Sequence, residues 1–581
     1  MNNSGYIQTA KTPDLVTYKV MSGDTELPVQ YGVKSIVVEK EVNRIPHARI
    51  VILDGSAPDQ DFKLSSENLL IPGKEIEITV GYHSKEETLF KGVVVKHNLK
   101  VKNGSTYLIV ECKDKAVKMT LGRKSKYFYE SKDSDIIEEL IGNSGATADV
   151  EATTKSHKEL VQYRASDWDF MVTRAQANGK LCFVDDGAIK VAKPKVSGET
   201  VETVVFGSSV HEFEGEIDAR DQYSKITASS WSYTDQEIVE AEAQDPGIAL
   251  NGDLSPSDLA AVFGIEDLQL RHGGKITQEE LQEWSDAKAT FQQLAKTRGT
   301  VTFQGIDKVK PGVLLKLEGL GNRFNGTIYV TGVRHEVAEG NWLVTAQFGL
   351  TPTWFSETYD VSEMPGSGIM PAISGLHVGV VSQLESDPDG EDRILVQIPI
   401  INNEEEGIWC RVATLDAGEN RGSFFRPEIG DEVIIGFIND DPNDAVVLGM
   451  LHSSAKPAPI TATDDNHEKG FVTRSEMKMM FNDDKISYTL ETPAGKKVIL
   501  DEDADIIKIE DEHSNVLTFK SDGITMESAG DIKIKASGDV SIEGTNVKLK
   551  ASAQFKAEGS SGSEVSSGAV TVVKGSQVKI N

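Results

Sequence analysis

The sequence has very few cysteines, and their placement excludes a disulfide framework. Among 581 residues, only Cys112, Cys182 and Cys410 are cysteines, an odd number without paired spacing. This usage fits reduced structural thiols in a protein that folds in the cytoplasm.

The sequence also lacks long apolar runs and an excess of positive charge. No run approaches the roughly 20 apolar residues of a transmembrane helix, and residues 1–5 (MNNSG) lack the basic and then apolar pattern of a signal peptide. The 60 basic and 91 acidic residues give a formal charge of −31. Binding to nucleic acids or to anionic membrane surfaces depends on basic residues. We therefore expect a protein that folds in the cytoplasm without a signal peptide and binds no nucleic acid.

Common motifs of catalytic and cofactor sites are missing as well. The sequence contains no Walker loop, dinucleotide fingerprint, His-Glu-x-x-His zinc motif or nucleophile elbow. Asp501, Asp503, Asp505 and Glu512 match part of an EF-hand loop, but Ile506 stands where the turn requires glycine. We interpret this run as a solvated acidic turn. The sequence predicts no catalytic residue, no metal site and no cofactor.

The composition and the residue patterns change along the chain and divide it into five regions. Residues 1–365 contain many strand-like segments with inserted helices, and residues 366–374 form a linker rich in glycine and serine. Residues 375–453 contain about five short strand patterns, which suit a small barrel. Residues 454–485 are interpreted as a polar connector, and residues 486–581 as a repetitive spike.

Three helices are predicted within the first region. One follows Ser134, a second is capped by Ser166, and a third begins with a capping box of Thr277 and Glu280 and is stopped by Gly299. Their apolar faces consist of Ile136, Ile137, Leu140 and Ile141; of Trp168, Met171, Val172 and Ala175; and of Leu281, Trp284, Ala287, Phe291, Leu294 and Ala295.

The end of the chain repeats with a period of about eight residues. The leading apolar residues of successive blocks fall at positions 524, 532, 540, 547 and 555, and the pattern resumes at 570–572 and 578–580. Within a block, apolar and polar side chains alternate, so that Ile532 and Ile534 oppose Lys533. Each block is therefore predicted to be a short strand with one dry face.

A single chain of such short strands cannot bury its apolar stripe or pair its edges. Three identical chains wound around one axis would bury every stripe and pair the edges, whereas a single-chain β-helix typically needs longer repeats. We therefore expect an intertwined trimer. The candidate residues of the trimer axis are Ile532, Ile534, Val540, Ile542, Val547, Leu549 and Phe555.

Several local motifs, and their order, resemble the VgrG spike family of type VI secretion systems and related contractile injection particles. This family is similar to the fused hub and spike of contractile phage tails. The motifs are QYRASDWDF at 162–170, RGTVTFQG at 298–305, VKPG at 309–312, FNG at 324–326, TGVRH at 331–335, FRPEIGDEV at 425–433 and DPND at 441–444.

The resemblance implies a mainly β fold: phage-hub-like β-barrel domains with inserted helices, an OB-fold barrel, and a C-terminal intertwined triple-stranded β-helix. It also implies a homotrimer whose hub joins the baseplate and inner-tube proteins of a phage-tail-like particle. The spike would carry effector cargo and a PAAR-type cap protein, contacted by candidates Val578, Lys579, Ile580 and Asn581. Contraction of a sheath would drive the spike out of the producing cell and through the membrane of the target cell.

Two departures from the family bear on enzymatic activity. Some relatives carry an effector domain after the spike, but this sequence stops at residue 581, inside the last repeat. The phage relative holds a lysozyme domain between barrel and needle, and residues 454–485 are too few for one. We therefore expect a non-enzymatic spike. A spike-borne hydrolase of the cell wall and a receptor-binding fibre are the alternatives. The host system, effector, target cell and cap protein stay open.

Overall fold

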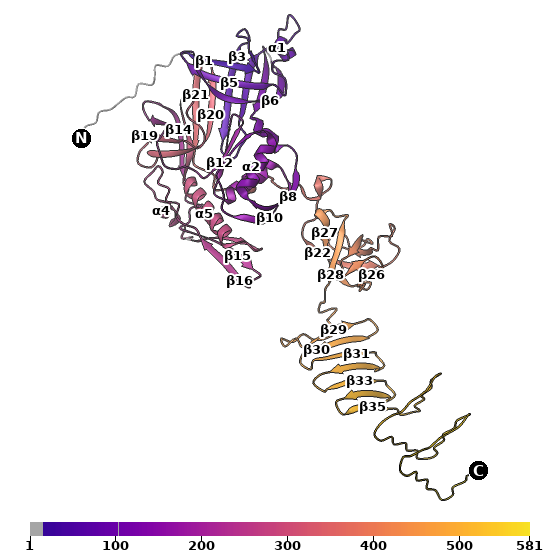
Figure 1. Cartoon of the computed structure of the whole chain (residues 1–581). Coiled ribbons are helices and arrows are strands. Elements are labelled where there is room, and N and C mark those ends of the chain that lie inside the picture. The colour runs from indigo at the N-terminus through magenta and orange to yellow at the C-terminus, as the bar shows by residue number, and fades with distance from the viewer. Residues whose placement is uncertain (1–14, 103, 266, 581) are drawn as a thin grey trace. The chain divides into compact units, whose positions relative to one another are not determined.

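The computed structural model describes residues 15–102, 104–265 and 267–580 (Figure 1). Its contacts divide the chain into two compact units. The first runs to Gly375 and includes Phe437–Asp444, and the second comprises Leu376–Gly436 and the chain from Ala445 onward. Strands dominate both units, so the prediction of a mainly β protein is confirmed.

A thirteen-stranded sheet forms most of the first unit. In order of pairing, its strands are β14 (Val210–Ile217), β18 (Thr297–Gln304), β21 (Asn341–Phe348), β20 (Gly326–Ala338), β3 (Val33–Glu41), β4 (His47–Leu53), β7 (Ser105–Lys113), β6 (Lys85–Lys102), β5 (Glu75–Tyr82), β1 (Val16–Ser22) and β2 (Thr25–Glu26), with β19 (Leu314–Glu318) on β20 and β13 (Glu202–Val205) on β19. Alternate side chains of these strands fill two apolar cores. The predicted strand segments at 36–38, 76–80 and 108–110 lie in β3, β5 and β7.

Two smaller sheets and two helices surround a third core. The elements are β8 (Lys124–Lys132) paired with β10 (Ser156–Ala165); β9 (Thr147–Val150), β11 (Leu181–Asp185) and β12 (Ala188–Ala192); and the helices α2 (Asp133–Ser144) and α3 (Asp167–Ala177). The predicted apolar faces of both helices are buried, and the Ser166 hydroxyl accepts from the Asp169 amide at 3.0 Å. The predicted start of α2 is wrong. The helix begins at Asp133, before Ser134, whose amide donates to the Thr153 hydroxyl at 3.1 Å.

The longest helix, α5 (Gln278–Ala295), covers a three-stranded sheet of β15 (Lys225–Ser232), β16 (Glu237–Glu242) and β17 (Asp267–His272). The capping box of Thr277 and Glu280 is confirmed, and of the predicted apolar face Trp284 alone is only partly buried. The prediction that Gly299 stops this helix is wrong, because α5 ends at Ala295 and Gly299 lies within β18. A side chain at Gly299 would meet the Glu214 carbonyl of β14, with Cβ only 2.1 Å from the oxygen. Close strand packing therefore explains this glycine.

A closed barrel begins the second unit. Its strands are β22 (Leu376–Gln383), β23 (Ile394–Gln397), β24 (Ile408–Val412), β28 (Ala445–Met450) and β27 (Glu432–Phe437). Their buried side chains include Val381, Val396 and Val433. The predicted five-stranded barrel is confirmed. The remaining short elements of the chain are α1 (Lys63–Ser66), η1 (Lys115–Thr120), α4 (Pro256–Ala260), α6 (Phe355–Thr358), η2 (Pro365–Gly368), β25 (Ala417–Gly418), β26 (Arg421–Gly422) and η3 (Ile438–Asp440).

An antiparallel meander of seven strands follows the barrel in sequence (Figure 1). Its strands are β29 (Glu468–Val472), β30 (Lys478–Asn482), β31 (Ser487–Glu491), β32 (Lys497–Asp501), β33 (Ile506–Glu510), β34 (Val516–Lys520) and β35 (Gly523–Glu527). Two expectations need correction here. The expected connector 454–485 contains β29 and β30, and the strands of 486–527 pair with their neighbours in the same chain instead of winding around partner chains. Turns of two to five residues make this antiparallel pairing possible.

The chain beyond β35 forms no strand within residues 528–580. Figure 1 shows it as a continuous ribbon without arrows. Every described residue from 529 to 580 is exposed. The expected strand blocks in this segment, and their winding around partner chains, stay predictions.

Candidate assembly surface

One face of the β29–β35 meander carries two continuous ladders of apolar and aromatic side chains. Residues two apart on a strand share a face, and direct cross-strand pairs continue each ladder to the next strand. The Phe471 ladder comprises Phe471, Met479, Leu490, Val498, Ile509, Leu517 and Met526, and the Phe481 ladder comprises Phe481, Tyr488, Leu500, Ile507, Phe519 and Ile524. We call these two ladders together the apolar sheet face.

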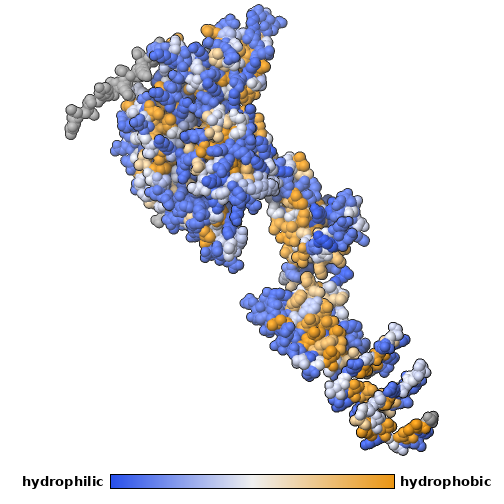
Figure 2. Space-filling view, in the orientation of Figure 1, coloured by the Kyte–Doolittle hydropathy of each residue, from blue (hydrophilic) through white to orange (hydrophobic). Residues whose placement is uncertain are grey.

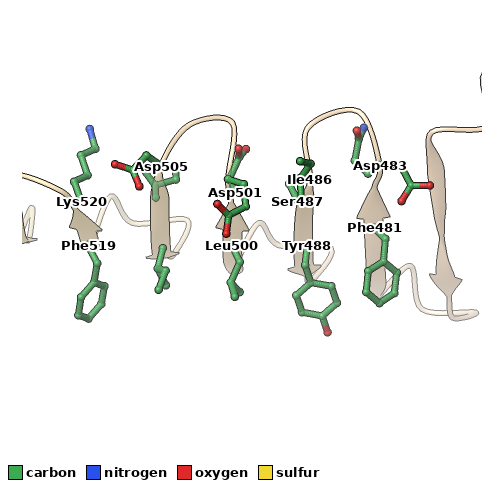
Figure 3. Close-up of a pocket in the computed structure, with 14 residues that line it drawn as sticks. Phe481, Asp483, Ile486, Ser487, Tyr488, Leu500, Asp501, Asp505, Phe519 and Lys520 are labelled. Atoms are coloured by element: carbon green, nitrogen blue, oxygen red, sulfur yellow. The ribbon is translucent and has the colours of Figure 1, made fainter.

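The apolar sheet face is open in the single chain. Phe481, Leu500 and Ile507 are 45%, 44% and 47% exposed. Figure 3 shows Phe481, Tyr488, Leu500 and Phe519 projecting from the same side of their strands, and Figure 2 shows apolar side chains gathered over this part of the chain. An exposed apolar patch that crosses six or seven strands is typical of an interaction surface.

An open hollow of about 670 Å³ lies along the Phe481 ladder. Its lining combines ladder side chains with residues of the adjacent turns, among them Asp483, Asp501 and Asp505 (Figure 3). Because the hollow is open and continues along the sheet, its shape fits another apolar surface better than an enclosed small molecule.

The opposite face of the meander is mostly polar, although it also carries Met480, Ile499, Ile506 and Val516. One row alternates in charge through Lys478, Glu491, Lys497 and Glu510, and the Lys497 ammonium lies 3.4 Å from a Glu491 carboxylate oxygen. A second row contains Thr489, Thr518 and Thr525. The meander therefore has one wet and one dry face, which is the pattern of a sheet that covers a core on one side only.

The run that resembles an EF-hand forms the turn between β32 and β33. The Ala504 amide donates to the Asp501 carboxylate at 2.8 Å, and the Glu502 amide donates to the Ile486 carbonyl of the neighbouring turn at 3.3 Å. Asp503 and Asp505 are therefore turn residues at one edge of the meander, and Asp501 is the last residue of β32. In the part of the chain that the structure describes, no group of three or more His, Cys, Asp or Glu side chains is arranged to hold a metal ion.

The sequence-predicted site residues lie beyond the meander. Each of the candidate axis residues is between 51% and 73% exposed in the single chain: Ile532, Ile534, Val540, Ile542, Val547, Leu549 and Phe555. The single chain does not gather them into a core. Of the candidate cap contacts, Val578, Lys579 and Ile580 are exposed, whereas Asn581 lies outside the described residues.

The apolar sheet face is not among the features predicted from the sequence. The signal for it was present, because the pairs Met479 and Phe481, Tyr488 and Leu490, and Val498 and Leu500 each alternate with polar neighbours. These pairs recur about ten residues apart, so they do not share the eight-residue period of the distal repeats.

A buried ion cluster ties together four elements of the first unit. Asp133 of α2 accepts from Nε and Nη2 of Arg174 in α3, at 2.6 and 2.8 Å. The same carboxylate lies 3.0 Å from Nε2 of His157 in β10, whose Nδ1 lies 3.3 Å from Glu280 of α5. Burial opposes ionisation of Asp133, but hydrogen bonds and the positive charge from Arg174 outweigh it and lower the pKa of this carboxyl to about 2.

An acidic loop of the barrel holds its own cation. The Arg393 guanidinium bonds to Asp387, with Nη2 2.6 Å from Oδ1, and it also pairs with Asp389. These hydrogen bonds hold the pKa of Asp387 well below its ordinary value. The guanidinium thus offsets part of the negative charge of this loop.

Two family models match the chain. Residues 12–339 match the model described as the Alg8 N-terminal domain, and residues 377–452 match the type VI secretion system/phage-baseplate injector OB domain. Within the described residues, no helix has the length and apolarity needed to cross a membrane.

The chain is also similar to known proteins. It is 22% identical over 454 residues to the type VI secretion system spike protein VgrG1b of Pseudomonas aeruginosa, covering 71% of this chain and 59% of that protein. It is 33% identical over 119 residues to the spike protein VgrG3 of Vibrio cholerae, covering 20% of this chain and 11% of that protein. The tail protein of Neisseria meningitidis superposes with a TM-score of 0.43 at 14% identity, covering 59% of this chain and 99% of that one. The chain thus spans about three fifths or less of the two spike proteins.

Proposed function

We propose that this chain, which belongs to the Alg8 N-terminal domain family and is a VgrG-like spike protein, acts as the trimeric central spike of a contractile injection system. The first unit joins the baseplate and inner tube. The repetitive region forms the tip that punctures the target envelope and carries a cap protein of the PAAR type and effector cargo. The role is structural, and the proposal assigns no catalytic residue.

The apolar sheet face is the observation that carries this proposal. A sheet with one apolar face must bury it against another layer, and among the described strands the meander is an open series from β29 to β35 that does not close on itself. Three copies with these faces turned inward bury all three faces around one axis. Two copies stacked face to face would bury the faces as well, so the number of chains is the decisive measurement.

The distal repeats extend the same principle beyond the meander. In residues 528–580 the side chains of the apolar stripe are exposed, and the described backbone joins no strand. Winding around two further copies supplies backbone partners to each block and places Ile534 and Leu549 at the axis. The stacked end of the prism, with Val578, Lys579, Ile580 and Asn581, then offers a blunt platform for the cap.

The proposal also places the chain in the cell. The spike assembles in the bacterial cytoplasm as part of a phage-tail-like particle, and leaves the cell when the particle fires. The tip contacts the target membrane transiently during puncture and does not reside in it.

The mass of the purified full-length chain in solution tests the assembly. Light scattering coupled to size exclusion should give three times the 63.2 kDa chain mass, without concentration dependence in the micromolar range. A stable monomer would contradict the proposal, since it would leave the apolar sheet face in water. A dimer would contradict the three-chain arrangement.

A further inference from the structure

We propose that the first unit carries a second, separate contact between copies, in which the acidic edge strand β14 of one copy pairs with the basic end of β6 of the next. This inference rests on the proposed spike, because it takes a second copy of the same chain as the partner. It concerns the large sheet of the first unit and not the repetitive region.

Strand β14 is an edge of the thirteen-stranded sheet. Among the described strands it pairs with β18 alone. Phe213 points to the core and stacks on Phe348, with ring centroids 6.1 Å apart. The alternate positions therefore face outward, and they are the exposed carboxylates Glu212, Glu214 and Glu216.

The end of β6 is a second unpaired edge. Strand β5 covers β6 from Lys85 to Val93, whereas β7 pairs with it as far as Lys102. From 95 to 102, no strand in the described parts of the chain lies on the other edge of β6. Leu99 is opposite the buried Leu108, so the outward row is Lys96, Asn98, Lys100 and Lys102.

The two edges carry opposite charges, and several of these charges are not used in ion pairs. The segment 95–102 contains three lysines and no acid, and β14 contains three glutamates and no lysine or arginine. Lys96 already pairs with Glu111, and Glu216 already pairs with Arg298. Within the described chain, no ion pair engages the other four: Lys100, Lys102, Glu212 and Glu214.

The spacing of the charges permits a matched register. Both rows repeat every second residue on the outer face of their strand. An antiparallel pairing that sets Lys102 opposite Glu212 also sets Lys100 opposite Glu214, with Asn98 opposite Glu216. The same pairing covers Leu99 and Val101, which are 40% and 68% exposed in the single chain.

The contact uses two different surfaces of each copy, so it runs head to tail. A heterologous contact of this kind closes into a ring when the rotation between copies is a whole fraction of a turn. In a three-chain spike, the ring gives the first unit its own symmetric interface, and every copy uses both of its edges once.

A disulfide across the two edges tests the inference in the full-length chain. The variant K100C with E214C should form reducible covalent trimers on mild oxidation, while each single variant stays uncrosslinked. The three native cysteines are buried and do not compete. As a matched control, K100C with E138C moves the partner cysteine to an exposed position of α2 and should give no covalent trimer.

The charge pair of Lys102 and Glu212 tests whether β6 and β14 pair in the proposed register. Adding K102E to the double-cysteine variant should slow crosslinking roughly tenfold, because two carboxylates then face each other, and adding E212K should restore the rate. A double-cysteine chain that has trimeric mass but gives no crosslink would overturn the inference and leave the proposed spike intact. A monomeric mass would instead contradict the spike itself.

Lysines on an edge strand have another known use, which is to block unwanted strand pairing. In that case K100Q with K102Q would cause concentration-dependent aggregation, and the cysteine pair would not crosslink. Our inference predicts instead that this neutral variant stays soluble and loses hydrogen-exchange protection in β6 and β14 together. Aggregation of this variant without crosslinking in the cysteine pair would overturn it.

Discussion

Phe425 of the barrel stacks on Phe471 of β29, with ring centroids 5.1 Å apart and ring planes within 13° of parallel. Beside this stack, Arg474 lies 2.8 Å from Glu428. Phe471 is the first member of the ladder that continues through Met479. The loop that precedes β27 is therefore attached to β29 by an aromatic contact and to the turn after β29 by an ionic contact.

Removal of this aromatic contact should loosen β29 without unfolding the barrel. The substitution F425A removes one aromatic pair worth about 1 kcal/mol, so amide exchange in β29 should become roughly fivefold faster. The neighbouring F424A is the control, because Phe424 is 88% exposed. Equal exchange rates in the two variants would show that the stack does not hold the strand.

A charge on the apolar sheet face should prevent assembly, whereas the same charge on the polar face should not. I524D places a carboxylate on the Phe481 ladder, and T525D places one on the opposite face of the same strand. Because a buried unpaired charge is strongly destabilising, we expect I524D to shift the mass to that of the single chain. T525D should keep the mass of the unsubstituted protein. Trimers of normal stability from I524D would argue against a buried face.

The distal repeats can be tested in the same way. I534D or L549D would bring three carboxylates together at one dry axis and should block assembly of this part of the spike. K533D and K548D change the alternate, outward positions and serve as controls. Limited proteolysis should cleave residues 528–580 rapidly in the first pair and slowly in the second. Equal protection in all four variants would contradict the assignment of the axis.

The buried cluster around Asp133 makes stability depend on acid pH. The pKa of Asp133 is about 2 in the folded chain and about 3.9 in an unfolded chain. The unfolded chain therefore binds the proton more readily, and about 2.6 kcal/mol of stability that is present above pH 4 is lost as the pH falls through 2.

The substitution D133N removes this titrating group. Its deficit in unfolding free energy relative to the unsubstituted chain should shrink between pH 5 and pH 2, as followed by denaturant titration with tryptophan fluorescence. The exposed carboxylate of Asp149 offers the control D149N, which should leave the pH dependence unaltered. A constant deficit for D133N across this range would mean that the carboxylate does not titrate with folding.

The parts of the fold that depend on local rules were predictable from the sequence. Ser166 caps α3 through the Asp169 amide three residues on, and Thr277 and Glu280 form their box over the same spacing. Long-range contacts were not predictable in this way. Gly299 is a glycine because β14 passes within contact distance, and the sequence offers no sign that residue 214 lies beside it.

In the candidate site, too, local features were predictable and contacts between distant residues were not. Alternation of apolar and polar residues correctly predicts strands with one dry face, as in Tyr488 and Leu490 of β31. Alternation does not say which chain supplies the neighbouring strand, so the meander was wrongly assigned to an intertwined arrangement. The cluster of Asp133, His157 and Glu280 spans almost 150 residues of sequence and could only be seen in the fold.

The meander and the distal repeats also differ in how fast they can form. Each meander strand pairs with its immediate neighbours in sequence, so its short turns can close within one chain, whereas burial of the apolar sheet face needs copies to meet. On the three-chain proposal, the repeats after Glu527 order only when copies meet, and that step speeds up with concentration. The meander then acts as the nucleus that aligns three chains in register before the rest of the tip winds up. Dilution during refolding should therefore delay both the burial of the apolar sheet face and the ordering of the tip, with the tip ordering last.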